Sequence, residues 1–215
     1  MDTLESINAL TRQTYNLAAQ KYHDLFHNEM NEKEYDRKLL NSFAAKFNKD
    51  SLICDARCGP SGHIGRYLFE KGLKVIGLDI SEKCVELARL YNPDMKFECA
   101  DIASMPFDNN SFDGVISYYS VINTPKIYVN GLFTEFHRVL KPDGYLLVAA
   151  KVGKAEGYID DLLGIKTKIY NTLFTKDEIV NYFKGSGFQI EFIDTRNPYD
   201  FEISNERIFA IGKKI

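Results

Sequence analysis

The sequence predicts an α/β protein whose mostly parallel sheet is covered by helices on both faces. Three observations carry this prediction. From residue 51 onward, short apolar runs alternate with amphipathic stretches, and clusters of glycine, proline and aspartate separate them. Strands and helices that alternate along a chain form parallel sheets, because each helix returns the chain to the starting edge of the next strand. The first 45 residues differ, since they contain helical stretches and many aromatic residues but no strand pattern, and they predict a helical cover.

The expected elements follow one another closely from residue 51. Strands are expected at residues 51–55, 74–79, 95–99, 112–117, 145–150, 188–194 and 206–212. Helices are expected at residues 63–71, 82–91 and 129–140, and from Thr175 to about residue 184. Gly72 ends the first of these helices, Ser81 caps the second, and Thr175-x-x-Glu178 is a capping box for the last. A turn is expected at residues 141–144, before the fifth strand.

Length, charge and cysteine content limit the classes of function. A chain of 215 residues fits one domain, with residues 1–48 as the helical cover and residues 49–215 as the core. The formal net charge of −3 gives no reason to expect nucleic acid, and no apolar run is long enough for a membrane helix. The polar start is not a signal peptide, and four cysteines without framework spacing favour a reducing cytoplasm and exclude a zinc site. We therefore expect a cytoplasmic protein without a metal.

A glycine-rich loop and two carboxylates mark the expected binding site. The loop at residues 55–62 (DARCGPSG) directly follows the first strand, where open parallel sheets bind their ligands. Asp79 ends the second strand, where a carboxylate can accept hydrogen bonds from both ribose hydroxyls. Asp101 follows the third strand and can accept from the exocyclic amine of adenine, with Ile80 and Ile102 as apolar walls for the ring. The loop and Asp79 alone also suit a nicotinamide dinucleotide, whereas the two acids together favour an adenosine without phosphates.

With these residues in place, the chain resembles the class I S-adenosylmethionine-dependent methyltransferases, in particular the small-molecule branch near the ubiquinone/menaquinone C-methyltransferases. The resemblance covers nearly the whole chain. It rests on five segments in order: LICDARCGPSGHIGRYLFEKG, VIGLDIS, FECADIASMPFDNNSFDGVIS, HRVLKPDGYLLVAA and KGSGFQIEF. It implies a Rossmann-like three-layer sandwich with a seven-stranded sheet, whose last strand is antiparallel and inserted between the fifth and the sixth.

The resemblance also implies roles for individual residues. The cofactor would be S-adenosylmethionine and the partner a small-molecule methyl acceptor. The cofactor-binding residues carried over by position are Asp55 and Gly59 for the methionine part, Asp79 for the ribose, Asp101 and Ile102 for the adenine, Ser117 beside the sulfonium and acceptor, and Tyr15 and Tyr22 in the N-terminal cover. The resemblance assigns no residue as a catalytic base. The sequence does not indicate the oligomeric state.

One departure from the family pattern keeps rival functions open. Arg57 and Ser61 stand where the family has glycine, so the cofactor loop is degenerate at two positions. A member that keeps the fold and acts by binding alone is therefore an alternative to a methyltransferase, and a nicotinamide-dependent oxidoreductase is a third reading. The long segment at residues 153–174 lies between a strand and a helix and is a candidate lid over the acceptor.

Overall fold

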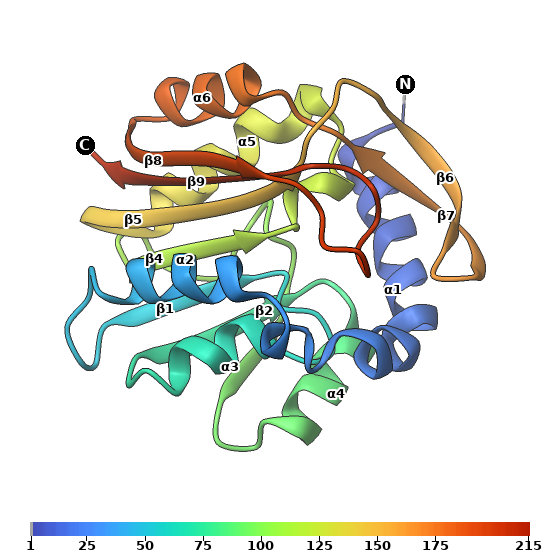
Figure 1. The fold of residues 1–215 in the computed structure, drawn as a ribbon, viewed down its shortest axis with the longest axis horizontal. Coiled ribbons are helices and arrows are strands. Elements are labelled where there is room, and N and C mark those ends of the chain that lie inside the picture. The colour runs from blue at the N-terminus through green and yellow to red at the C-terminus, as the bar shows by residue number, and fades with distance from the viewer. Residues whose placement is uncertain (1) are drawn as a thin grey trace.

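The computed structural model describes residues 2–215 and has a seven-stranded sheet at its centre (Figure 1). The order of its strands is β3-β2-β1-β4-β5-β9-β8. Their bounds are β1 Leu52–Ala56, β2 Lys74–Asp79, β3 Lys96–Cys99, β4 Phe112–Tyr118, β5 Leu140–Lys151, β8 Phe188–Arg196 and β9 Arg207–Lys214. The order reverses at β1, because β2 and β4 flank it on opposite sides. Ligands of open α/β sheets bind at such a reversal, at the carboxyl ends of the strands.

The directions of the strands confirm the predicted fold class. Strands β1 to β5 pair in parallel, while β9 is antiparallel to both β5 and β8. The last strand of the chain is thus antiparallel and lies between β5 and β8, as the family resemblance implied. No helix described between residues 2 and 215 combines the length and apolar character that crossing a membrane requires.

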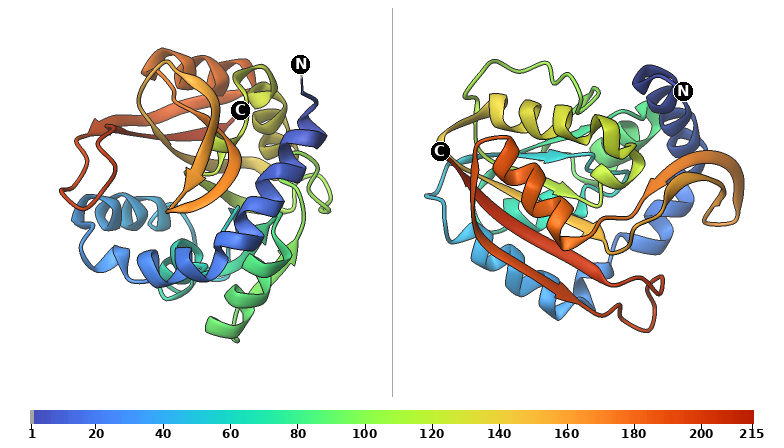
Figure 2. Two further views of the ribbon diagram at one scale, coloured as in Figure 1. Left: turned by 90° about the vertical axis from the view of Figure 1, so that its right-hand side faces the viewer. Right: turned by 90° about the horizontal axis from the view of Figure 1, so that it is seen from above.

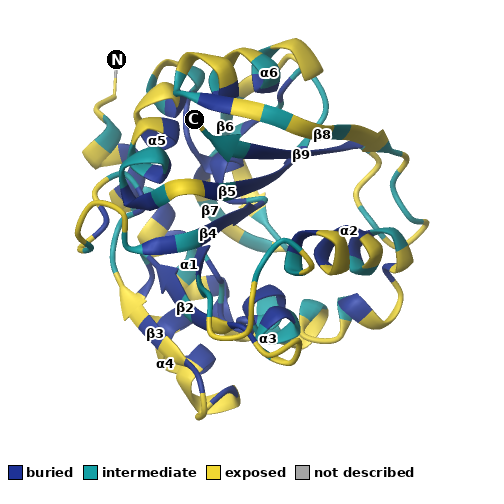
Figure 3. Cartoon of the chain, turned by 90° about the vertical axis from the view of Figure 1, so that its left-hand side faces the viewer, coloured by how far each residue is buried: buried dark blue, intermediate teal, exposed yellow. Residues whose placement is uncertain are grey.

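Helices cover both faces of the sheet, and alternate residues of each central strand enter two separate apolar cores. One face packs against α5, Lys126–Val139, and α6, Lys176–Gly185. The other packs against α2, Glu34–Ala44, α3, His63–Phe69, and α4, Glu82–Tyr91. In β9, Ile208 and Ala210 face the first core and Phe209 and Ile211 the second, as the two-residue period of a strand requires. Burial of both faces explains why these strands read as continuous apolar runs (Figure 3).

The N-terminal segment is helical, as its lack of a strand pattern predicted. Helix α1, Leu4–Phe26, is capped by the Thr3 side chain and is followed by the short helix η1, Glu29–Asn31, and then by α2. Helix α1 runs past the carboxyl end of the sheet, beside α4 and the hairpin described next (Figure 2). Asn16 joins it to the start of α4, where its side-chain oxygen accepts from Ser81 Oγ at 2.6 Å. The helix thereby forms a wall of the ligand-binding edge.

The segment at residues 153–174 is more regular than the sequence indicated. It contains an antiparallel hairpin of β6, Glu156–Leu162, and β7, Ile165–Thr172. Leu163 and Gly164 have φ values of 59° and 78° at its tip, the left-handed pair of a two-residue hairpin turn. Thr167 shares a hydrogen bond of 2.7 Å with Thr14 of α1. The candidate lid is therefore a hairpin anchored on the N-terminal helix.

Most predicted boundaries agree with the structure within three residues, and the largest difference is the start of β5. The sequence predicted a turn at residues 141–144, but the strand begins at Leu140, opposite Phe112. The pairing then shifts register and resumes at Gly114 and Tyr145, with Asp143 at a φ of 64° between them. The turn residues are thus accommodated as a bulge rather than as a break in the sheet.

Candidate functional site

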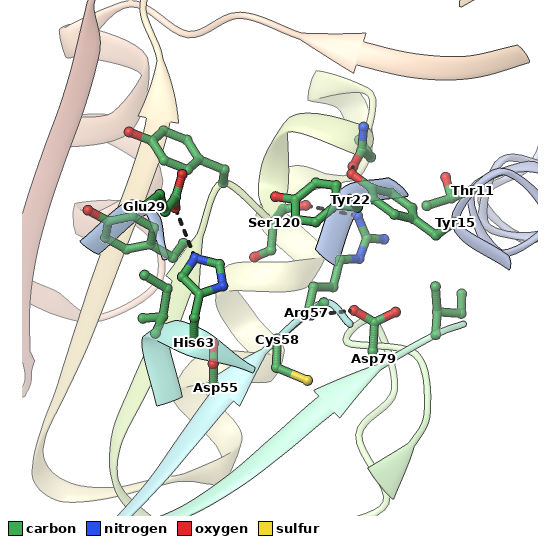
Figure 4. Close-up of a pocket in the computed structure, with 16 residues that line it drawn as sticks. Thr11, Tyr15, Tyr22, Glu29, Asp55, Arg57, Cys58, His63, Asp79 and Ser120 are labelled. Carbon is green, nitrogen blue, oxygen red and sulfur yellow. Dashed lines mark hydrogen bonds and ion pairs between the residues drawn. The ribbon is translucent and has the colours of Figure 1, made fainter. Parts of the chain in front are cut away.

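A pocket lies at the carboxyl ends of β1, β2 and β4, beneath α1 (Figure 4). It is lined by Thr11, Tyr15, Tyr22, Glu29, Asp55, Arg57, Cys58, Gly59, His63, Ile64, Asp79, Ile80, Tyr118, Tyr119, Ser120 and Asn123. Its free volume is only about 40 Å³, whereas pockets for drug-sized ligands measure about 300–1,000 Å³. The position is that of a ligand site in an open α/β sheet, but the side chains in it leave little space.

The glycine-rich loop and Asp79 form one hydrogen-bonded unit. Gly59 and Gly62 have φ values of 66° and 55°, which glycine adopts without strain. The Gly59 N–H donates to Asp79 Oδ2 at 3.0 Å, and the Ser81 N–H donates to Oδ1 at 2.9 Å. Burial raises the pKa of Asp79, and these backbone donors partly oppose the effect. The carboxylate is therefore held in one orientation at the pocket wall.

Asp55 supports the same loop from below. Its side chain is buried, and Oδ2 accepts a hydrogen bond of 2.9 Å from the Gly65 N–H at the start of α3. Gly65 has no room for a side chain, because a Cβ there would lie 2.9 Å from the same oxygen. Burial raises the pKa of Asp55 to about 6, against the lowering influence of His63. Asp55 thus joins β1 to α3 beneath the loop.

Arg57 occupies the middle of the pocket. It follows β1 with a φ of 64°, a conformation that family members with glycine at this position reach without cost. Its Nη1 donates to the Ser120 carbonyl oxygen at 2.8 Å, and its Nη2 lies 3.4 Å from Asn8 Oδ1. Burial lowers the pKa of Arg57, and the charges of Asp101 and Asp79 oppose this shift. The side chain points across the pocket, between Asp79 and Tyr15 (Figure 4).

The residues predicted for the adenine end separate into two groups. Ile80 lines the pocket, whereas Ile102 is fully buried in the core beside α5. Asp101 accepts from Asn8 Nδ2 of α1 through one oxygen and from the Ala103 N–H at 2.9 Å through the other. Asp101 therefore also caps its own turn and joins it to α1.

Tyr15 and Tyr22 both line the pocket from α1. Their rings lie 6.1 Å apart, and the Tyr15 hydroxyl donates to Asn123 Oδ1 at 3.2 Å. Burial raises the pKa of both phenols, so they are neutral donors. Ser117 lies deeper, buried and hydrogen-bonded to Ser120 Oγ, and the residues that reach the pocket after β4 are Tyr118 and Tyr119.

Comparisons with known proteins agree with this geometry. Residues 54–148 match the family described as "Methyltransferase domain". The 24-methylenesterol C-methyltransferase 2 of Arabidopsis thaliana is 32% identical over 170 residues, which cover 74% of this chain and 43% of the relative. Residues 54–148 therefore match a methyltransferase domain, and the chain is similar to C-methyltransferases over most of its length. It spans less than half the length of the first sterol methyltransferases that it matches.

Solved methyltransferases share the fold. The 1,6-didemethyltoxoflavin-N1-methyltransferase of Burkholderia thailandensis, solved with S-adenosylhomocysteine, is 14% identical with a TM-score of 0.76 and covers 100% of this chain and 91% of its own. The magnesium protoporphyrin IX methyltransferase of Synechocystis PCC 6803, solved with S-adenosylmethionine, is 16% identical with a TM-score of 0.76 and covers 100% of both chains. Both of these solved structures hold an S-adenosyl ligand.

The walls of the pocket suit S-adenosylmethionine, but its free volume is too small for that cofactor. The Asp79 carboxylate, the open Gly59 backbone and the two tyrosines present the donors and acceptors that an adenosyl amino acid needs. The Arg57 side chain fills the space between them.

The sequence did not reveal a network of buried charges at the other end of the pocket. Glu29 Oε1 lies 2.9 Å from His63 Nε2, and Glu29 Oε2 accepts from Lys33 Nζ at 2.8 Å. Lys33 also contacts Glu202, which Arg196 contacts at 2.6 Å. These partners come from the N-terminal cover, the start of α3, the end of β8 and the loop between β8 and β9, so no local pattern connects them.

The network continues to the tyrosines after β4. The Tyr118 hydroxyl donates to Asp36, whose other oxygen lies 2.8 Å from Arg196. Tyr119 has a φ of 55°, and its hydroxyl is buried without a hydrogen-bond partner. Among residues 2–215, no group of three or more potential metal ligands comes together. This end of the pocket is thus polar and aromatic.

Proposed function

We propose that this chain is an S-adenosylmethionine-dependent methyltransferase that acts on a small-molecule acceptor in the cytoplasm. The observation that carries the proposal is the unit of Gly59 and Asp79 at the point where the strand order reverses. A fixed carboxylate there can accept hydrogen bonds from both ribose hydroxyls, and Gly59, which has no side chain, lets the rest of the cofactor approach the loop backbone. The relatives named above, which methylate sterols, a toxoflavin precursor and a magnesium porphyrin, support a small acceptor.

Each predicted residue has a place in this proposal. Asp79 would hold the ribose, Asp101 with Ile80 the adenine, and Asp55 and Gly59 the loop under the methionine part. Tyr15 and Tyr22 would cover the cofactor from α1. Ser117 and Ile102 would act from behind the wall, since both are buried in the protein. The acceptor would enter between α1, the β6–β7 hairpin and the turn at Tyr118–Asn123.

Methyl transfer from S-adenosylmethionine requires little of the protein's side chains beyond orienting the cofactor and the acceptor. A bound S-adenosylmethionine supplies an activated methyl group that leaves by in-line displacement. The protein's contribution is to align the acceptor and exclude water, and alignment of this kind contributes about 7–11 kcal/mol in well-positioned reactions. The buried tyrosines and the hairpin fixed on α1 suit that role.

A second candidate function is binding without methyl transfer, and Arg57 is the observation that favours it. The guanidinium group lies where the cofactor would pass, hydrogen-bonded to Ser120. The nicotinamide-dependent oxidoreductase has no such support, since the methyltransferase family matches the chain and β9 is inserted antiparallel between β5 and β8.

A thermal-shift panel tests the proposal. The wild-type protein is heated with S-adenosylmethionine, S-adenosylhomocysteine or NAD⁺, each well above its expected dissociation constant. A ligand at 100 times its dissociation constant stabilises by about 2.7 kcal/mol, so the S-adenosyl compounds should raise the melting temperature and NAD⁺ should not. A shift with NAD⁺ alone would overturn the proposal.

A further inference from the structure

The most unusual side chain in the pocket is Arg57. Its backbone stands in the left-handed region directly after β1, which directs the side chain over the loop and into the pocket. Figure 4 shows the guanidinium group between the Asp79 carboxylate and the Tyr15 ring, with Ser120 on the far side. These are the walls between which the proposed function places the ribose and the neighbouring part of the cofactor.

The contacts of Arg57 are weak for a partly buried cation. Both of its hydrogen bonds go to neutral oxygen atoms, at 2.8 Å on Ser120 and 3.4 Å on Asn8. Its Nε is buried and has no hydrogen-bond partner. By contrast, Arg196 contacts Asp36 at 2.8 Å and Glu202 at 2.6 Å. A guanidinium group that holds a wall together would be paired as Arg196 is, so Arg57 is the more easily displaced of the two.

Charge explains why a cation resides there at all. Asp79 is buried in the pocket wall and Asp101 lies beyond Asn8, and both carboxylates attract the guanidinium group. A sulfonium centre is also a cation. Two cations between the same pair of acids would repel each other at short range, where the surroundings screen little. The pocket is therefore arranged for one positive charge, from Arg57 or from a ligand.

We propose that Arg57 is an internal competitor of the cofactor: its guanidinium group fills the pocket and supplies the positive charge between the two acids, so that an S-adenosyl ligand binds only after this side chain has turned out. The inference rests on the proposed function. It identifies Arg57 as the residue that sets cofactor affinity, and it accounts for a pocket of about 40 Å³ in a fold that holds an entire S-adenosyl group elsewhere.

Two substitutions separate the bulk of Arg57 from its charge. Arg57→Gly removes both, and it also suits the left-handed backbone. Arg57→Gln keeps much of the bulk and removes the charge. Arg12→Gln is the matched control, because Arg12 is exposed on α1 and the change in net charge is the same.

The test is calorimetric titration of the wild type and the three variants with S-adenosylmethionine, which carries the sulfonium charge, and with S-adenosylhomocysteine, which does not. We expect Arg57→Gly to bind at least tenfold more tightly than the wild type, Arg57→Gln to show a smaller gain, and Arg12→Gln to match the wild type. Circular dichroism checks that each variant is folded.

Two results would overturn the inference, and they bear differently on the proposed function. If the wild type binds and neither Arg57 variant binds more tightly, Arg57 is no competitor, while the proposed function stands. If no folded variant binds either ligand at all, both fail.

Discussion

The backbone N–H of Gly59 donates a 3.0 Å hydrogen bond to the carboxylate of Asp79, which joins the loop after β1 to the end of β2. The two residues are 20 positions apart in the chain, but the parallel pairing of β1 with β2 brings their strand ends together. The bond fixes the conformation of the loop and the direction of the carboxylate at once. The account of the site depends on this unit, and the first prediction tests it.

Replacing Asp79 with alanine should weaken S-adenosylhomocysteine binding by about 2–4 kcal/mol, the scale of losing charge-assisted hydrogen bonds to two hydroxyls. Calorimetry measures the change. Asp108→Ala is the control, since Asp108 is exposed on the loop before β4. Unchanged affinity in a folded Asp79 variant would remove this residue from the site.

Replacing Asp101 with asparagine should reduce binding of S-adenosylhomocysteine more than binding of its deaminated inosyl analogue. The reason is that asparagine offers the exocyclic amine a weaker, uncharged acceptor. Paired titrations of both ligands measure the difference. Equal losses would show that Asp101 acts through its bonds to Asn8 and Ala103 instead.

Replacing Gly62 with alanine should destabilise the protein by about 1–3 kcal/mol. The residue has a φ of 55°, and a Cβ would lie 2.8 Å from the Phe97 ring. Gly185→Ala is the matched control, because nothing lies within 4 Å of its Cβ position at the end of α6, and it should be neutral or stabilising by about 0.4–1 kcal/mol. Urea unfolding compares them, and equal effects would refute the assigned loop conformation.

The raised pKa of Asp55, about 6 against 3.8 for the free side chain, predicts a pH dependence of stability. Between these values the unfolded chain has released the proton and the folded protein still holds it, so the free energy of unfolding falls as pH rises. The loss from pH 4 to pH 7 should be about 2 kcal/mol. Asp55→Asn should lack it, as urea unfolding at several pH values would reveal. Parallel pH profiles for both proteins would contradict the burial effect.

Much of the site could be predicted because its residues directly follow strands. Asp55, Gly59 and Asp79 stand at strand ends that the apolar runs identify, and parallel pairing brings such ends to one edge. Ser117 does not line the pocket. Strand β4 continues to Tyr118, and the pocket lining after β4 begins at that residue. Side chains near a strand end thus depend on a boundary that sequence fixes only approximately.

The hairpin and the charge network could not be predicted in the same way. The only turn signal between β6 and β7 is a single glycine after Leu163, and a register shift between Ile159 and Asp161 interrupts the alternation. Glu29 of η1 meets His63 at the start of α3, 34 residues further along the chain. Such contacts arise from tertiary packing and leave no local pattern in the sequence.

The position of S-adenosylhomocysteine in a crystal structure of its complex with the wild-type protein tests the central claim most directly. The account predicts the ligand in the pocket beneath α1, with its ribose hydroxyls within hydrogen-bond distance of the Asp79 carboxylate and the Arg57 guanidinium group released from the Ser120 carbonyl. A ligand bound elsewhere, or one bound in the pocket without contact to Asp79, would contradict it.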